Sequence, residues 1–139
     1  MAVSGRALAW LGCVLGATTN LFCALPVRLV PRTQHPLTGG PSPVAVDTAP
    51  PPAEVEAVSP APAPDCAWLD GQWNWVEHGW EWAPGGWVQL EPGCAYAPPL
   101  AVWVPSVEGG GVLFYTHGQW YRENAGAACP PPSHCIGKP

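Results

Sequence analysis

Tryptophan interrupted by glycine is the feature that most limits what this chain can fold into. Six of the twenty-two positions between residues 67 and 88 are tryptophan. This block holds two copies of a W-x-x-G-x-W motif with a slipped copy between them, and a later copy has tyrosine in first place. The motif residues are Trp68, Gly71, Trp73, Trp82, Gly85, Trp87, Tyr115, Gly118 and Trp120. Some tryptophans lie seven apart, as in a helical heptad, but glycine recurs too often for a helix.

Turn-forming dipeptides separate short alternating runs along this block. They are Asp70-Gly71, His78-Gly79, Pro84-Gly85 and Pro92-Gly93. Asp-Gly suits a two-residue hairpin turn, and Pro-Gly suits a type II turn. The runs between them alternate large and polar side chains, which predicts strands near 72–76, 80–82 and 87–90, then 100–104, 112–116 and 118–122. The predicted fold class is mostly β: a small antiparallel meander of short hairpin strands with one aromatic face.

The repeat resembles the bacterial WxxGxW (also written YxWGxW) family of exported proteins, many of them lipoproteins. The resemblance covers roughly residues 68–120. It implies a location in the cell envelope and a β-rich repeat, and it implies no activity.

The amino terminus predicts export. Arg6 precedes an apolar run from Ala7 to Ala17, the order found in secretory signal peptides. Two alternatives stay open: residues 7–27 could form an uncleaved membrane anchor, or Cys13 could carry a lipid. The expected localisation is therefore exported, in the periplasm, the outer envelope or the extracellular space.

Composition divides the chain into three parts. We expect a signal peptide or anchor helix over 1–24, a Pro/Ala-rich disordered linker over 25–65, and a small Trp-rich β domain over 66–139. Eleven of the twenty prolines fall between Pro26 and Pro64, whereas eight of the nine tryptophans follow Asp65. Proline removes backbone donors and disfavours helix before it, so an extended spacer with no stable sheet is expected there.

The cysteines indicate covalent cross-links. Outside the targeting segment the chain has four, at Cys66, Cys94, Cys129 and Cys135. In a small exported domain this predicts two disulfides, with three pairings open.

The charge pattern bears on the partners. Between residues 66 and 122 the only basic side chain is Arg122, against five acidic ones. Nucleic acid is then excluded as an expected partner, because its recognition relies on clustered Lys and Arg. The expected partner is an envelope protein or a glycan, with membrane attachment only through residues 7–27.

The tryptophan face has two interpretations. The rings can form the core of a domain poor in leucine and isoleucine, or they can stay partly exposed and stack on sugar rings. For the second case the candidate binding residues are Trp75, Trp80 and Trp82, together with His78 at the turn that they flank.

Metal binding and catalysis are not expected. His78, His117 and the C-x₄-H-C run at 129–135 lack a familiar zinc spacing, and Glu77, Glu81 and Glu91 resemble solvated hairpin residues. We therefore expect no cofactor and a non-enzymatic exported envelope protein with a structural or protein-interaction role. The alternative is a cell-wall or exopolysaccharide-binding module that uses an exposed Trp strip.

Overall fold

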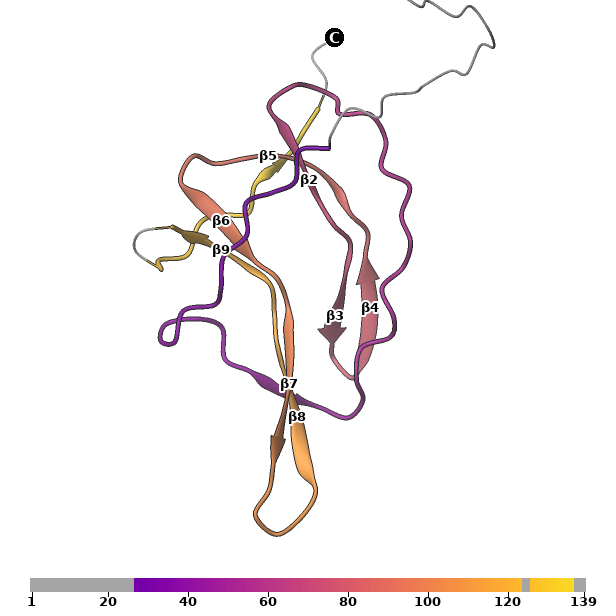
Figure 1. The fold of residues 1–139 in the computed structure, drawn as a ribbon, viewed down its shortest axis with the longest axis vertical. Coiled ribbons are helices and arrows are strands. Elements are labelled where there is room, and N and C mark those ends of the chain that lie inside the picture. The colour runs from indigo at the N-terminus through magenta and orange to yellow at the C-terminus, as the bar shows by residue number, and fades with distance from the viewer. Residues whose placement is uncertain (1–26, 124–125, 137–139) are drawn as a thin grey trace, which may run out of the picture.

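The computed structural model describes residues 27–123 and 126–136, and these form an antiparallel β structure without a helix (Figure 1). The strands are β1 (Val44–Val46), β2 (Cys66–Leu69), β3 (Gln72–Val76), β4 (Gly79–Ala83), β5 (Gly86–Gln89), β6 (Cys94–Ala97), β7 (Leu100–Pro105), β8 (Gly111–Thr116), β9 (Gln119–Arg122) and β10 (Ser133–His134). Within these ranges no helix has the length and apolarity needed to cross a bilayer. The expected signal or anchor helix over 1–24 lies outside the described residues.

Two long bent hairpins make up the body of the fold. In the first, β2 pairs with β5 and β3 pairs with β4 in one continuous register, from Cys66 opposite Gln89 to Val76 opposite Gly79. In the second, β6 pairs with β9 and β7 with β8, from Cys94 opposite Arg122 to Pro105 opposite Gly111. Each ladder is interrupted once, and the interruption divides each hairpin into two short sheets.

The strands are antiparallel and short, as expected, but they are not arranged as a meander. Asp70-Gly71 and Pro84-Gly85 do not reverse the chain: they face each other where the first hairpin bends. The reversal of this hairpin lies at Glu77-His78. A local turn signal cannot distinguish a bend from a reversal, because that depends on which strands pair.

Residues 27–47 correct the expectation of a disordered linker that forms no sheet. Trp68 N–H donates to the Arg28 carbonyl at 2.7 Å, and Tyr96 N–H donates to the Pro31 carbonyl at 2.8 Å. Further along, β1 pairs with β8. Proline lacks an N–H but keeps its carbonyl, so a proline-rich segment still accepts hydrogen bonds from a strand edge. The segment thus joins both hairpins.

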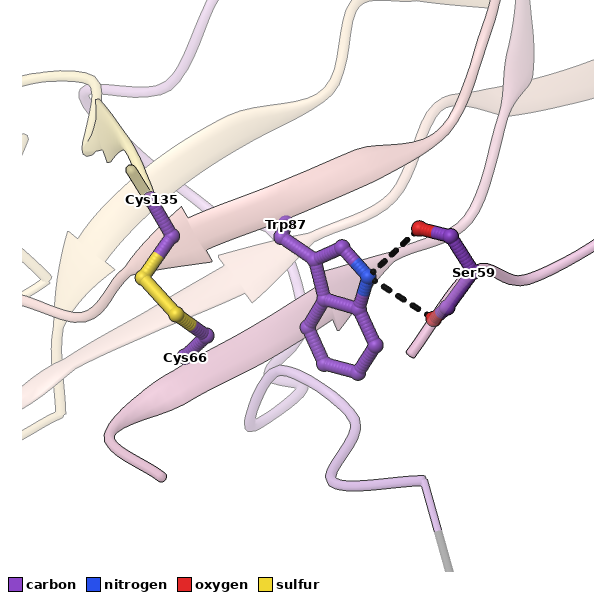
Figure 2. The surroundings of a disulfide bond; sticks show 4 residues. All are labelled: Ser59, Cys66, Trp87 and Cys135. Atoms are coloured by element: carbon purple, nitrogen blue, oxygen red, sulfur yellow. Dashed lines mark hydrogen bonds between the residues drawn. A yellow bond between two sulfur atoms is a disulfide. The ribbon is translucent and has the colours of Figure 1, made fainter. Parts of the chain in front are cut away.

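Two buried clusters and two disulfides stabilise the fold, and the first cluster contains residues of both hairpins. One cluster centres on Ala67, Val88, Tyr96 and Trp120, and the other packs Trp68 and Trp87 against the Cys66–Cys135 bond. Figure 2 shows Trp87 and this bond. The second bond joins Cys94 to Cys129. Two disulfides are confirmed, with the pairing that sequence left open now assigned.

Candidate functional site

Tryptophans on opposite strands of the first hairpin pack in pairs. The pairs are Trp68–Trp87, Trp73–Trp82 and Trp75–Trp80, with ring centroids 5.5, 5.2 and 5.1 Å apart and edge-to-face geometry. Edge-to-face contact is the favoured geometry for aromatic rings, since the electron-poor edge meets the electron-rich face. The two motif copies are therefore the two strands of one hairpin: the first tryptophan of one copy faces the last of the other.

A proline-rich segment, which we call the strap (residues 48–59), lies along this hairpin beside β4 (Figure 1). Four indole N–H groups donate to it: Trp80 to the Thr48 carbonyl at 3.1 Å, Trp73 to the Pro52 carbonyl at 3.0 Å, Trp82 to Glu56 Oε1 at 3.4 Å, and Trp87 to the Ser59 carbonyl at 3.1 Å. Figure 2 shows the last contact, where the indole also reaches the Ser59 hydroxyl. The aromatic face is thus covered by the chain's own strap.

The carboxylate of Glu56 enters the bend of the hairpin. Gly71 N–H donates to Oε2 at 2.9 Å, and Gly85 N–H donates to Oε1 at 2.8 Å. A Cβ on Gly71 would lie 2.5 Å from Oε2, and one on Gly85 would lie 2.6 Å from it. Both motif glycines therefore lack a side chain where the carboxylate must approach the backbone. We call Gly71, Gly85 and the Trp82 indole the carboxylate receptor.

The third motif copy uses its glycine differently. A Cβ on Gly118 would overlap the Tyr96 ring, which lies across the bend of the second hairpin. The Tyr96 hydroxyl donates to Gln72 Oε1, and burial raises the pKa of this tyrosine above its ordinary value of 10. A tyrosine of the same hairpin therefore fills the place that the strap's glutamate fills in the first.

An open cleft of about 470 Å³ lies at the tip of the first hairpin. Its walls include Trp75, His78, Glu77, Asp47 and His117. Glu77 has φ of 52°, in the left-handed region that side chains disfavour. Two of the candidate binding residues, Trp75 and His78, meet in this cleft.

The other two candidates contact the strap. Trp80 packs edge-to-face on Trp75, and the indoles of Trp80 and Trp82 donate to the strap, so the three rings do not form a bare row. Among the described residues, one group could gather ligands for a metal: Asp65, Cys66 and Cys135. Its two sulfurs are joined in a disulfide, which removes them as thiolate ligands.

Glu56 is the residue that sequence reasoning missed. It is one of two glutamates within the proline-rich tract, and nothing in its neighbourhood marks it as a ligand for glycines 15 and 29 residues away. The only signal is the pair of motif glycines, Gly71 and Gly85, which the sequence assigns to turn dipeptides.

Comparison with known proteins gave no match: no family model, no curated protein and no solved structure is significantly similar to this chain.

Proposed function

We propose that this is a non-enzymatic exported protein whose role is to bind another envelope protein through its second hairpin. The observation that supports this is the exposure of β7, whose six residues are all exposed and uncharged. The β7–β8 arm projects beyond the rest of the molecule (Figure 1). Within the described ranges β7 is the outer strand of the β1-β8-β7 sheet, so one of its edges has no neighbouring strand.

The side chains of this arm favour a protein partner. Leu100, Val102, Val104 and Phe114 line one apolar hollow of about 460 Å³. Trp103, on the opposite face, is 57 % exposed. Sheet edges are usually protected by charges or bulges, and an uncharged apolar edge is suited to adding a strand from a partner. We call this surface the β7 edge.

Export is supported by the cross-links. Two intramolecular disulfides are typical of extracellular or periplasmic proteins, because the cytoplasm keeps thiols reduced. The apolar segment after Arg6 and the resemblance to the exported WxxGxW proteins point the same way.

A photo-crosslinking side chain at Val102, introduced into the full chain in its native host, tests this proposal. We expect one dominant crosslinked protein from position 102 and none from Glu81, an exposed residue of β4 in the first hairpin. Adding Trp103→Lys to the Val102 probe should reduce the adduct at least ten-fold. Equal crosslinking from positions 102 and 81, or an adduct indifferent to Trp103→Lys, would overturn the proposal.

Glycan binding is the second candidate function, and the cleft beside Trp75 is the observation that favours it. An aromatic ring beside two carboxylates and two imidazoles combines a stacking surface with hydrogen-bonding groups for hydroxyls. The test is retention of the purified chain on insoluble peptidoglycan and on exopolysaccharide. We expect Trp75→Ala to lose retention at least ten-fold and Trp103→Ala to keep it; no retention of the unmodified chain excludes this candidate.

A further inference from the structure

The strap contacts the first hairpin in the way a bound peptide does. None of its residues belongs to a strand, and all except Glu56 are exposed. The hairpin donates to it through four indoles and two glycine N–H groups. The segments on either side behave differently: β1 pairs with β8, and β2 pairs with β5.

The donors of the hairpin match the chemistry of a proline-rich chain. Prolines lack N–H groups and favour extended backbone, so their segments display carbonyl acceptors and bind in aromatic-lined grooves. Here the indoles of Trp80, Trp73 and Trp87 donate to strap carbonyls at the positions of Thr48, Pro52 and Ser59. These bonds recognise the backbone, and two of the indoles also reach a hydroxyl, that of Thr48 at 3.3 Å and that of Ser59 at 3.2 Å.

The carboxylate receptor adds selectivity. It places two backbone N–H groups and one indole N–H around a single carboxylate, that of Glu56. An occupant without an acid at this position would leave these donors without their acceptor, which is unfavourable for partly buried groups. The groove therefore combines recognition of an extended proline-rich backbone with recognition of one acidic side chain.

We propose that the groove formed by Trp73, Trp80, Trp82 and Trp87 with the carboxylate receptor is a binding site for proline-rich peptides that carry a glutamate. The strap is its intramolecular occupant. A partner peptide must displace the strap, whose effective concentration is in the millimolar range because it is tethered at both ends. This site is on the first hairpin and does not depend on the proposed role of the β7 edge.

The experiment compares Glu56→Gln in the full chain with the matched control Glu54→Gln, which removes the same charge two residues away. The probe is a fluorescent synthetic peptide with the sequence of residues 46–62, followed by anisotropy. We expect the Glu56→Gln chain to bind it at least ten-fold more tightly than either the unmodified chain or the Glu54→Gln chain. A peptide carrying its own Glu56→Gln change should bind the Glu56→Gln chain at least ten-fold more weakly. Equal binding of both peptides, or no saturation by the unmodified peptide at millimolar concentration, would overturn the proposal.

A second measurement covers the case in which Glu56→Gln does not fold. The unmodified, isotope-labelled chain is titrated with the unlabelled peptide to several millimolar. The amide resonances of Val55 and Glu56 in the strap of the labelled chain should shift as the peptide takes its place, because the released strap loses its contacts with the hairpin. The amide of Gly109, in the loop of the second hairpin, should not shift. Unchanged strap resonances would contradict the proposal. Concentration-dependent dimers of the chain that dissociate on adding the peptide would support it, with the strap of a second copy as the ligand.

Discussion

Tyr115 joins the two hairpins through a single side chain. It is only 2 % exposed, although it belongs to the projecting β8 strand. Its hydroxyl lies within hydrogen-bond distance of two acceptors for its single proton, the Trp73 carbonyl at 3.2 Å and Asn74 Oδ1 at 3.1 Å, and its ring is edge-to-face with that of Trp80. Burial is the main cause that raises the pKa of Tyr115 to about 12.

This raised pKa predicts a loss of stability at high pH. The unfolded tyrosine ionises near pH 10, whereas the folded one keeps its proton up to about pH 12. The contribution of Tyr115 is thus fully present below pH 10 and falls between pH 10 and 12, by at most about 1.4 kcal/mol per pH unit. Urea unfolding across this range should show a steeper decline for the unmodified chain than for Tyr115→Phe. Parallel pH profiles would contradict the prediction.

At the same scale, the large aromatic residues were the most predictable part of the molecule. Trp68, Trp87 and Trp120 are buried, which agrees with the first of the two interpretations of the tryptophan face, rings that form the core. Trp103 is exposed, although its sequence environment does not distinguish it from the buried tryptophans. Alternation predicts on which face of a strand a side chain lies, but it does not predict what covers that face. Of the candidate residues near the tip, Trp75 and Trp80 pack against each other, and the strap accepts hydrogen bonds from Trp80 and Trp82.

The bend of the first hairpin is the element on which the recognition site depends. There the ladder between β2 and β5 ends and that between β3 and β4 begins. At the bend the N–H groups of Gly71 and Gly85 donate to Glu56. In an uninterrupted ladder they would belong to the regular pattern between the two strands. A flat hairpin of the same length would not hold the carboxylate of Glu56.

Alanine substitutions at two glycines of this hairpin test the bend. A Cβ on Gly71 would lie 2.4 Å from the Trp82 ring and 2.5 Å from Glu56, whereas one on Gly86 meets nothing within 4 Å. We expect Gly71→Ala to lower the free energy of unfolding by about 1–3 kcal/mol, through overpacking. Gly86→Ala should leave it unchanged or raise it by about 0.4–1 kcal/mol. The measurement is the urea midpoint at constant slope, and equal midpoints would contradict the proposed close approach.

Strand positions could be predicted at this scale, and strand partners could not. Alternation and turn residues predicted a strand at 72–76, which is β3, and a last strand at 118–122, which contains β9 (119–122). Both could be predicted because these signals are local. The pairing of β2 with β5 depends instead on packing Trp68 against Trp87, nineteen positions apart (87 minus 68). The docking of the strap was beyond prediction for the same reason, since proline content indicates extension but not what the extended chain contacts.

Over the whole molecule, distant segments are held together by covalent bonds. Cys66–Cys135 closes a loop of sequence separation 69 and Cys94–Cys129 one of 35. Each hairpin is thereby tied at its open end to the carboxyl-terminal segment, where β10 also pairs with β5. The sequence predicted two disulfides with three pairings open, but it could not predict that this segment adds a strand.

Reduction should therefore unfold the protein. In the chain-entropy model, loops of these lengths contribute about 4 kcal/mol each, of the same order as the whole stability of a small domain. We expect tryptophan fluorescence to show unfolded protein in excess reductant at 25 °C and a cooperative urea transition without it. The paired variant Cys94→Ser with Cys129→Ser should stay folded in the absence of reductant, with a lower urea midpoint. An unchanged midpoint after reduction would contradict this prediction.

The contact between Glu56 and the two glycines also has an evolutionary consequence. Positions separated by 15 and 29 residues serve one interaction, so selection on the acid depends on both glycines. A side chain at either glycine removes the reason to keep the acid. The glycines have further reasons to be kept, because a Cβ would lie 2.4 Å from the Trp82 ring at position 71 and 2.7 Å from the Leu69 carbonyl at position 85. In descendants of this chain we expect an acid at position 56 only where both glycines are retained, whatever happens to the prolines between them.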